Sequence, residues 1–153
     1  MEVNARLQVE HPVSEMLTGV DIVRQQILAC TENRIELENG VLDTHGHAIE
    51  CRINALSPGK IPELEIPGGP GVRFDSALYQ GAYVPPYYDS MIAKLIVHAE
   101  NRDAALARMD RALAELLIGG VKTNTDMQRH IINHPVFRSG SFDTSFYDRY
   151  CAG

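Results

Sequence analysis

The sequence lacks an apolar stretch of roughly 18 residues, the length at which a membrane-spanning helix is considered. Its N-terminus also lacks the basic region and apolar run of a secretion signal. Three cysteines, Cys30, Cys51 and Cys151, lie far apart without a CxxC spacing, which supports neither a disulfide framework nor a zinc site. We therefore expect a cytoplasmic protein that does not bind a membrane.

An excess of basic residues is also missing, because the net charge is −6 and the isoelectric point lies near 5.4. Phosphate backbones are bound by concentrated Lys and Arg, so we expect no nucleic acid partner. The chain contains 44% hydrophobic and 22% charged residues, which is typical of a globular protein. Its 153 residues suffice for one domain with a core, next to at most part of a second.

Residues 1–10 alternate between two kinds of side chain. The apolar set is Met1, Val3, Ala5, Leu7 and Val9, and the polar set is Glu2, Asn4, Arg6, Gln8 and Glu10. A period of two places each set on its own face, so the pattern predicts a strand with one polar face. A short helix is expected next, because Pro12 suits a first helical turn and Gly19 can end it.

Periodic segments flank a turn-rich stretch at residues 33–46, where we place a domain boundary that divides the chain into residues 1–42 and 43–153. Before this stretch, a second helix is predicted, with one side formed by Val20, Val23, Ile27 and Cys30. After it, residues 47–54 alternate again and predict another strand. Its two faces are His47, Ile49, Cys51 and Ile53 on one side, and Ala48, Glu50, Arg52 and Asn54 on the other.

The rest of the chain predicts an antiparallel sheet covered by helices, in the α+β class. Prolines and glycines between residues 56 and 86 separate short apolar runs, which favours hairpins. Residues 91–98 are nearly all apolar, as in a buried strand. Residues 103–118 predict a helix that Gly119-Gly120 would end, with its apolar side formed by Leu106, Met109, Leu113 and Leu117. Shorter helices are expected at residues 125–133 and, rich in aromatic rings, at 143–150.

The polar face of the first predicted strand is the part best suited to chemistry. Glu2 and Asn4 offer oxygen ligands for a hard cation such as Mg²⁺. Arg6 presents a planar fork for a carboxylate-shaped anion, and Glu10 can act as a general base. Spacing alone favours a merely solvated face, but solvated faces are rich in Thr and Lys, whereas this one has planar hydrogen-bonding groups and no Lys.

The order of these residues resembles a family signature. Residues 2–12, EVNARLQVEHP, are similar nearly letter for letter to the last catalytic strand of biotin carboxylases, which belong to the ATP-grasp superfamily. The resemblance continues at residues 50–55 (ECRINA), 57–60 (SPGK), 85–91 (PPYYDSM), 100–102 (ENR) and 122–124 (KTN). It covers the whole chain, which aligns with the last third of that enzyme.

The resemblance implies that Glu2 and Asn4 hold the Mg²⁺, or Mn²⁺, that bridges the phosphates of ATP. It also implies that Arg52 stabilises negative charge on the ureido oxygen of biotin while the ring nitrogen is carboxylated. Without the resemblance, a surface ion pair with Glu50 or another acid is the favoured interpretation of Arg52.

Bicarbonate is the other substrate that the resemblance implies. Arg6, Gln8 and the backbone of Val9 would seat it, and Glu10 would take its proton. Nucleophilic bicarbonate would then attack the γ-phosphate of ATP, and the carboxyphosphate so formed would supply carbon dioxide to a biotin on a carrier protein.

The implied fold is the antiparallel sheet of a biotin carboxylase C-terminal domain with its helices, preceded by the last strand and helices of an ATP-grasp domain. Implied partners are the biotin carboxyl carrier protein, carboxyltransferase subunits and the missing N-terminal part of the same enzyme. Nothing in the sequence corresponds to the family's N-terminal domain or to the glycine-rich lid whose lysines close over ATP. The chain alone is therefore expected to be inactive.

The sequence departs from the family at two places, which changes what we expect of the biotin side and of the dimer contact. Only Leu56 separates Ala55 from residues 57–59, whereas family members carry several more residues there. The loop on the biotin side is therefore short. Arg73 matches a position of the bacterial dimer contact, but Pro70 stands where a bulky aromatic residue can occur. Because apolar area is lost there, at most a weak homodimer is expected.

Two alternatives remain open. The corresponding segment of pyruvate carboxylase is the second enzyme that the signature fits. The chain could also be a non-catalytic remnant that binds carboxylase subunits as an interaction module. An open reading frame that continues upstream of Met1 into a glycine-rich lid would favour the enzyme, whereas a nearby stop codon would favour the remnant.

Overall fold

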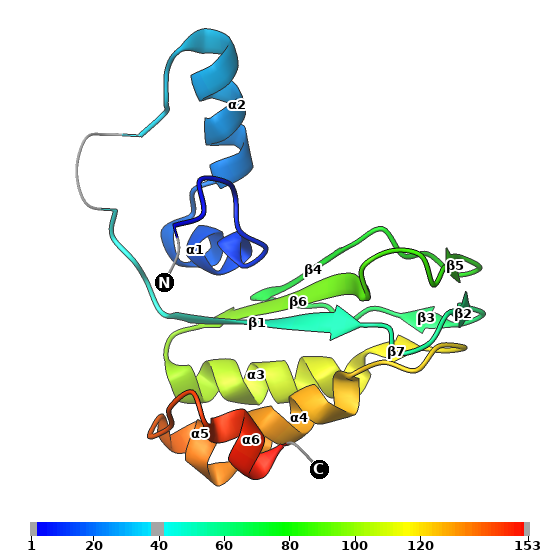
Figure 1. Ribbon diagram of the computed structural model, residues 1–153. Helices are drawn as coiled ribbons and strands as arrows, with labels where there is room; N and C mark the ends of the chain where they lie inside the picture. Colours follow the sequence, from blue (N-terminus) through cyan, green and yellow to red (C-terminus); the bar gives the residue numbers. More distant parts are fainter. Residues whose placement is uncertain (1–2, 38–41, 152–153) are drawn as a thin grey trace.

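Helices and short strands surround one longer sheet in the computed structural model, which describes residues 3–37 and 42–151 (Figure 1). The helices are α1 (His11–Thr18), α2 (Ile22–Glu32), α3 (Arg102–Glu115), α4 (Thr125–Asn133), α5 (Pro135–Ser139) and α6 (Phe146–Tyr150). The strands are β1 (His47–Asn54), β2 (Gly59–Lys60), β3 (Leu64–Glu65), β4 (Val72–Ser76), β5 (Tyr83–Val84), β6 (Met91–Ala99) and β7 (Leu117–Ile118). The α+β class and its antiparallel sheet are thus confirmed.

The main sheet has the order β1-β6-β4, and both strand pairs are antiparallel. β6 lies in the middle because its apolar run suits burial on both faces, where Leu95, Ile96 and Val97 have no exposed surface. The predicted strands at residues 47–54 and 91–98 are therefore confirmed. None of the helices in the described ranges is long and apolar enough to cross a membrane.

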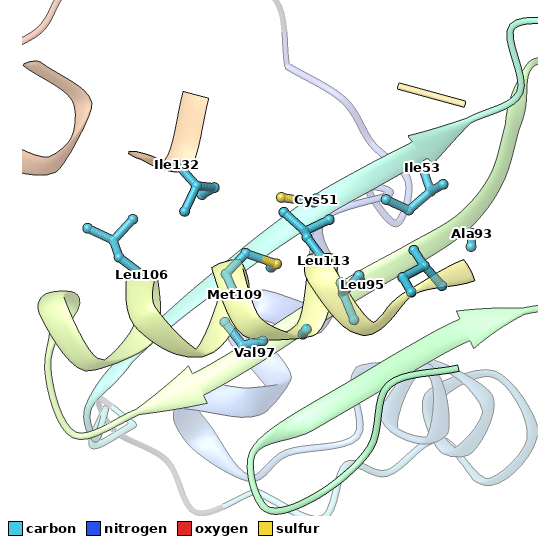
Figure 2. Close-up of a cluster of buried hydrophobic side chains, with 11 residues drawn as sticks. Cys51, Ile53, Ala93, Leu95, Val97, Leu106, Met109, Leu113 and Ile132 are labelled. Carbon is cyan, nitrogen blue, oxygen red and sulfur yellow. The ribbon is translucent and has the colours of Figure 1, made fainter. Parts of the chain in front are cut away.

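The sheet lies between two groups of helices. α3 packs on β6 and β1 from one side, with α4 beside it, while α1 packs on β1 and β6 from the other side (Figure 1). Figure 2 shows the cluster between α3 and the sheet. It includes Cys51, Ile53, Ala93, Leu95, Val97, Leu106, Met109, Leu113 and Ile132. Burial raises the pKa of the Cys51 thiol to about 12, so this cysteine acts as an apolar core residue.

The strand expected at residues 1–10 is not formed by the part of it that the structure describes, residues 3–10. A strand requires a neighbour for its backbone hydrogen bonds, and no described strand pairs with this segment. Val3, from the expected apolar face, is 96% exposed. Met1 and Glu2 lie outside the described residues.

Both N-terminal helices form as expected, but one predicted side does not reach the core. Pro12 lies in the first turn of α1, and Gly19 ends this helix with a φ of 72°. On α2, Val23 and Ile27 are exposed, and the buried residue is Leu28.

Strand pairing between residues 56 and 90 differs from the expected hairpins. β2 pairs with β5, β3 with β7 and β4 with β6, so strands that are adjacent in the sequence do not pair. Local turn signals mark where strands end but do not select the partner, which for β4 is the distant apolar strand β6.

The helix predicted at residues 103–118 ends early, and its glycines have another role. α3 stops at Glu115 because Leu117–Ile118 leave the helix to pair with β3 as β7. Gly120 has a φ of 82°, and a Cβ there would collide with the backbone oxygen of Lys60. This glycine therefore permits close backbone packing after β7 instead of capping a helix. The helix at residues 125–133 is confirmed, whereas the aromatic helix α6 is shorter than expected, Phe146–Tyr150.

Candidate active site on the outer face of the sheet

Charged side chains form two rows on the face of the sheet that α1 covers. The register places Arg52 opposite Lys94 on β6, and Lys94 opposite Asp75 on β4. One step along, Ile96 separates Glu50 on β1 from Arg73 on β4. Alternation along each strand points these residues away from the core, which lies on the α3 side.

Each of the three strands contributes one cation that bonds to the segment from Val9 to Glu15. From β1, Arg52 Nη2 donates to Oε2 of Glu10 at 2.8 Å. From β6, Lys94 Nζ donates to the backbone oxygen of Val9 at 3.1 Å. From β4, Arg73 Nη1 donates to Oε2 of Glu15 at 2.6 Å. We call these three contacts the segment clamp.

The pair of Arg52 and Glu10 joins two residues predicted to be catalytic, although 42 positions separate them in the sequence. Both side chains are about half exposed, at 50% and 54%. A hydrogen bond from its own backbone N–H, together with the Arg52 guanidinium, holds the pKa of Glu10 below its ordinary value. Glu10 is therefore ionised at neutral pH, and it becomes a stronger base when Arg52 moves away.

Arg73 is held within the chain by two carboxylates. Besides Glu15, it binds Asp75 through two hydrogen bonds of 2.8 Å. These partners raise the pKa of Arg73 above its ordinary value. Glu15 Oε1 also accepts a hydrogen bond from the backbone N–H of Ile22, so Glu15 links β4 to the start of α2. The position expected at a dimer contact thus anchors α1.

A hollow of about 500 Å³ opens beside the clamped segment. Four residues predicted for the site line it, namely Asn4, Arg6, Gln8 and Glu10. Arg6 is exposed, and its charge also lowers the pKa of Glu10. The structure therefore gathers these four residues around one space even though they do not form a strand. Glu2, the other expected metal ligand, lies outside the described residues.

Residues from the start of α1 and from α2 form one wall of the hollow. His11 Nδ1 donates to the backbone oxygen of Gln8 at 2.7 Å, which fixes the turn between the segment and α1. Ser14 from α1 and Gln26 from α2 add further polar groups to the lining. The remaining side is open to solvent.

Glu50 is a charged residue of the same face without a bonded partner. Both of its carboxylate oxygens are shielded from solvent, and neither has a hydrogen bond within the described residues. Loss of hydration raises the pKa of Glu50, and the nearby positive charges of Lys94 and Arg52 only partly oppose this effect. Arg52 forms the surface ion pair expected from the residues alone, but its partner is another acid, Glu10, and not Glu50.

Replacing Glu50 by Gln is expected to raise the free energy of unfolding by about 1 kcal/mol at pH 7. The wild-type carboxyl has a raised pKa in the folded state, so its ionisation reduces stability as the pH rises above its ordinary 4.5. Because Glu50 is partly exposed and lies near cations, the expected gain in free energy of unfolding is at the lower end of the range for unpaired buried groups. Urea unfolding of both variants at pH 7 and pH 4 measures it.

The difference between these variants should shrink at pH 4, where the wild-type carboxyl is also largely neutral in both states. Glu63→Gln, at an exposed position remote from the sheet face, provides the matched control. A Glu50→Gln variant that is less stable than wild type at pH 7 would contradict the prediction.

Sequence reasoning missed the contributions of Lys94 and Glu15. Lys94 lies inside an apolar run that predicts a buried strand, and Glu15 lies on a helix where an acidic residue is ordinary. A charged residue within a strand that is otherwise apolar was the available signal, because such a residue needs a partner.

Two family models match the chain. The family described as "Biotin carboxylase C-terminal domain" matches residues 50–149. The chain belongs to the biotin carboxylase family. The family described as "Carbamoyl-phosphate synthase L chain, ATP binding domain" matches residues 1–37, which include the lining of the hollow.

Curated relatives match almost the whole chain. Biotin carboxylase 1 of Bacillus subtilis is 47% identical over 98% of the chain, which spans 35% of that relative. A pyruvate carboxylase subunit from Methanothermobacter thermautotrophicus is 45% identical over 100% of the chain, which spans 33% of that relative. The chain thus covers about a third of the length of these relatives.

Solved structures of biotin carboxylase domains have the same fold. The biotin carboxylase domain dimer of 2-oxoglutarate carboxylase from Hydrogenobacter thermophilus, in complex with MgADP, ADP and bicarbonate, matches with a TM-score of 0.91 and 42% identity. The match covers 95% of this chain and 34% of that one. Biotin carboxylase from Campylobacter jejuni, solved with a β,γ-ATP compound, matches with a TM-score of 0.89 and 44% identity over the same shares.

Proposed function

We propose that this chain forms one wall of a biotin carboxylase active site, which uses MgATP and bicarbonate to carboxylate biotin on a carrier protein. The observation that carries the proposal is the bond between Arg52 and Glu10. It brings together Glu10, which can accept a proton, and Arg52, which can stabilise an oxyanion, beside the hollow. Family membership and the complexes solved for relatives support the same chemistry.

Bicarbonate would lie in the hollow against Arg6, Gln8 and the backbone of Val9. Arg6 presents a planar cation to the two oxygens of the anion. Glu10 accepts the bicarbonate proton, and an oxygen of the doubly charged anion then attacks the γ-phosphorus of ATP, which breaks its bond to the bridging oxygen, releases ADP and forms carboxyphosphate. The raised basicity of Glu10 after Arg52 departs favours this proton transfer.

The metal expected with ATP would be bound by Glu2 and Asn4. Carboxylate and amide oxygens suit Mg²⁺, which usually takes only one or two protein ligands and completes its shell with phosphates and water. No cluster of three His, Cys, Asp or Glu residues that could hold a metal occurs within residues 3–37 and 42–151. When bound, the ion neutralises charge on the transferred phosphoryl group.

Arg52 would serve both halves of the reaction in turn. While bicarbonate is absent, its guanidinium neutralises Glu10. When biotin arrives, the same group moves to the ureido oxygen and stabilises the negative charge that develops there. Its half-exposed position on β1 leaves room for this movement.

Membership of the biotin carboxylase family supports the proposed partners, and the open side of the hollow agrees with a further part of the same enzyme closing it. The N-terminal part of the same enzyme would supply the lid over ATP, and the biotin carboxyl carrier protein and carboxyltransferase subunits would bring biotin and remove its carboxyl group. Relatives include both biotin carboxylases and a pyruvate carboxylase subunit, so the proposed reaction is the step that these enzymes share. The homodimer is proposed to be weak because of Pro70.

Glu10→Gln in the complete protein is expected to lower bicarbonate-dependent ATP hydrolysis by about 10²-fold, because the amide cannot accept the proton. Phosphate release with MgATP, with and without bicarbonate, measures the effect. Glu63→Gln is the control, since Glu63 is exposed and remote from the hollow. A complete protein without bicarbonate-dependent hydrolysis would refute the enzyme proposal and favour a non-catalytic interaction module.

A further inference from the structure

Lys94 is the least expected member of the segment clamp. It is a lysine in the central strand, its side chain is only 14% exposed, and an apolar residue lies on either side of it in the sequence. Burying an ammonium group in such a strand is unfavourable unless the charge is paired and its donors are bonded. A role for this lysine must therefore explain what its ammonium group contacts.

Two groups contact the ammonium, and a third influences its surroundings electrostatically. Nζ donates to the backbone oxygen of Val9 at 3.1 Å and lies 3.7 Å from Oδ2 of Asp75. The shielded carboxylate of Glu50 is close enough for the charge of Lys94 to be the main influence that lowers its pKa. Asp75 on β4 thus pairs with the charge of a lysine whose hydrogen bond goes to the substrate-side segment.

We propose that Lys94 is a positioning residue for bicarbonate, which fixes the backbone of Val9 so that the groups around it face the anion. This inference rests on the proposed function. A donor on the carbonyl of Val9 restrains the peptide plane that joins Val9 to Glu10, because the peptide unit is planar. Gln8 lies just before this plane and Glu10 follows it, so one hydrogen bond restrains the backbone that carries the proposed bicarbonate contacts.

The other clamp contacts cannot replace this restraint. Arg52 holds the side chain of Glu10, which has to be released during the reaction. Arg73 holds Glu15, which lies more than a helical turn beyond Val9. Lys94 is the clamp residue that contacts the segment's backbone, and its hydrogen bond does not involve the Glu10 side chain that Arg52 holds.

Lys94→Met in the complete protein tests the proposal, because methionine keeps much of the length and removes the donor. We expect the KM for bicarbonate to rise about tenfold or more, and the KM for ATP to stay within about twofold of wild type. Lys94→Arg retains a cationic donor and should recover most of the affinity. Lys122→Met is the matched control, because Lys122 is exposed and lies outside the hollow.

Hydrogen exchange of the same variants separates positioning from stability and does not depend on enzyme activity. Lys94→Met should speed exchange in the peptide that covers residues 7–13 and leave β1 and β6 protected. An unchanged KM for bicarbonate, faster exchange throughout the sheet, or equal defects in Lys94→Met and Lys94→Arg would overturn the proposal. If wild type shows no bicarbonate-dependent hydrolysis, the proposed function fails, whereas the exchange result still decides whether Lys94 restrains the segment.

Discussion

The isolated chain of 153 residues should release no phosphate above background when it is incubated with MgATP, bicarbonate and free biotin. Phosphoryl transfer depends on cations and closing loops that surround the phosphates. The described residues provide a hollow with one open side, and none of the residues that line it is a lysine. The chain also spans only about a third of its relatives.

Weak ATP affinity and self-association should accompany the missing activity. Val3 and the exposed side of α2, which includes Val23 and Ile27, present apolar surface to solvent. Light scattering and ATP titration of the isolated chain, beside the complete protein under the same conditions, measure both effects. Turnover by the isolated chain that requires bicarbonate and disappears in Glu10→Gln would contradict the expectation.

Arg52→Ala in the complete protein should lower biotin carboxylation by about 10² to 10³-fold, the usual loss when one oxyanion-stabilising donor is removed. Bicarbonate-dependent ATP hydrolysis should fall far less, because Glu10 remains and loses the cation that depresses its pKa. The ratio of carboxybiotin formed to phosphate released is therefore the informative measurement.

Arg111→Ala is a matched control for this substitution. Arg111 forms an ion pair with Glu115 whose side chains are 46% and 47% exposed, close to the exposure of the pair between Arg52 and Glu10. Both variants lose one half-exposed ion pair, which contributes little to stability. Equal losses of carboxylation and ATP hydrolysis in Arg52→Ala would contradict a role on the biotin side.

Sequence periodicity predicted the helices and strands whose own residues carry a clear apolar pattern. β1, β6 and α4 appear where alternation or helical spacing indicated them. The prediction of a strand at residues 1–10 was wrong for the part that the structure describes. The alternating pattern is typical of a strand inside a sheet, but no described strand pairs with this segment. The end of α3 was misplaced because β3 pairs with Leu117–Ile118, a contact that no local pattern contains.

The candidate site was predictable only through the order of its residues. Spacing alone favoured a solvated face, and the resemblance to a signature directed attention to Arg6, Glu10 and Arg52. The sequence did not predict that Arg52 bonds to Glu10, because this contact depends on how α1 packs on β1.

The position of β6 in the sheet has a consequence for how the chain folds during synthesis. β1 and β4 both pair with β6 and not with each other, although β6 follows them in the sequence. Neither strand therefore has its sheet partner until Met91–Ala99 has left the ribosome. Such long-range pairing is slow, and unpaired strands are prone to aggregation until it is complete. Because α3 begins at Arg102, soon after β6 ends, the helix that covers the core becomes available almost as soon as the sheet can form.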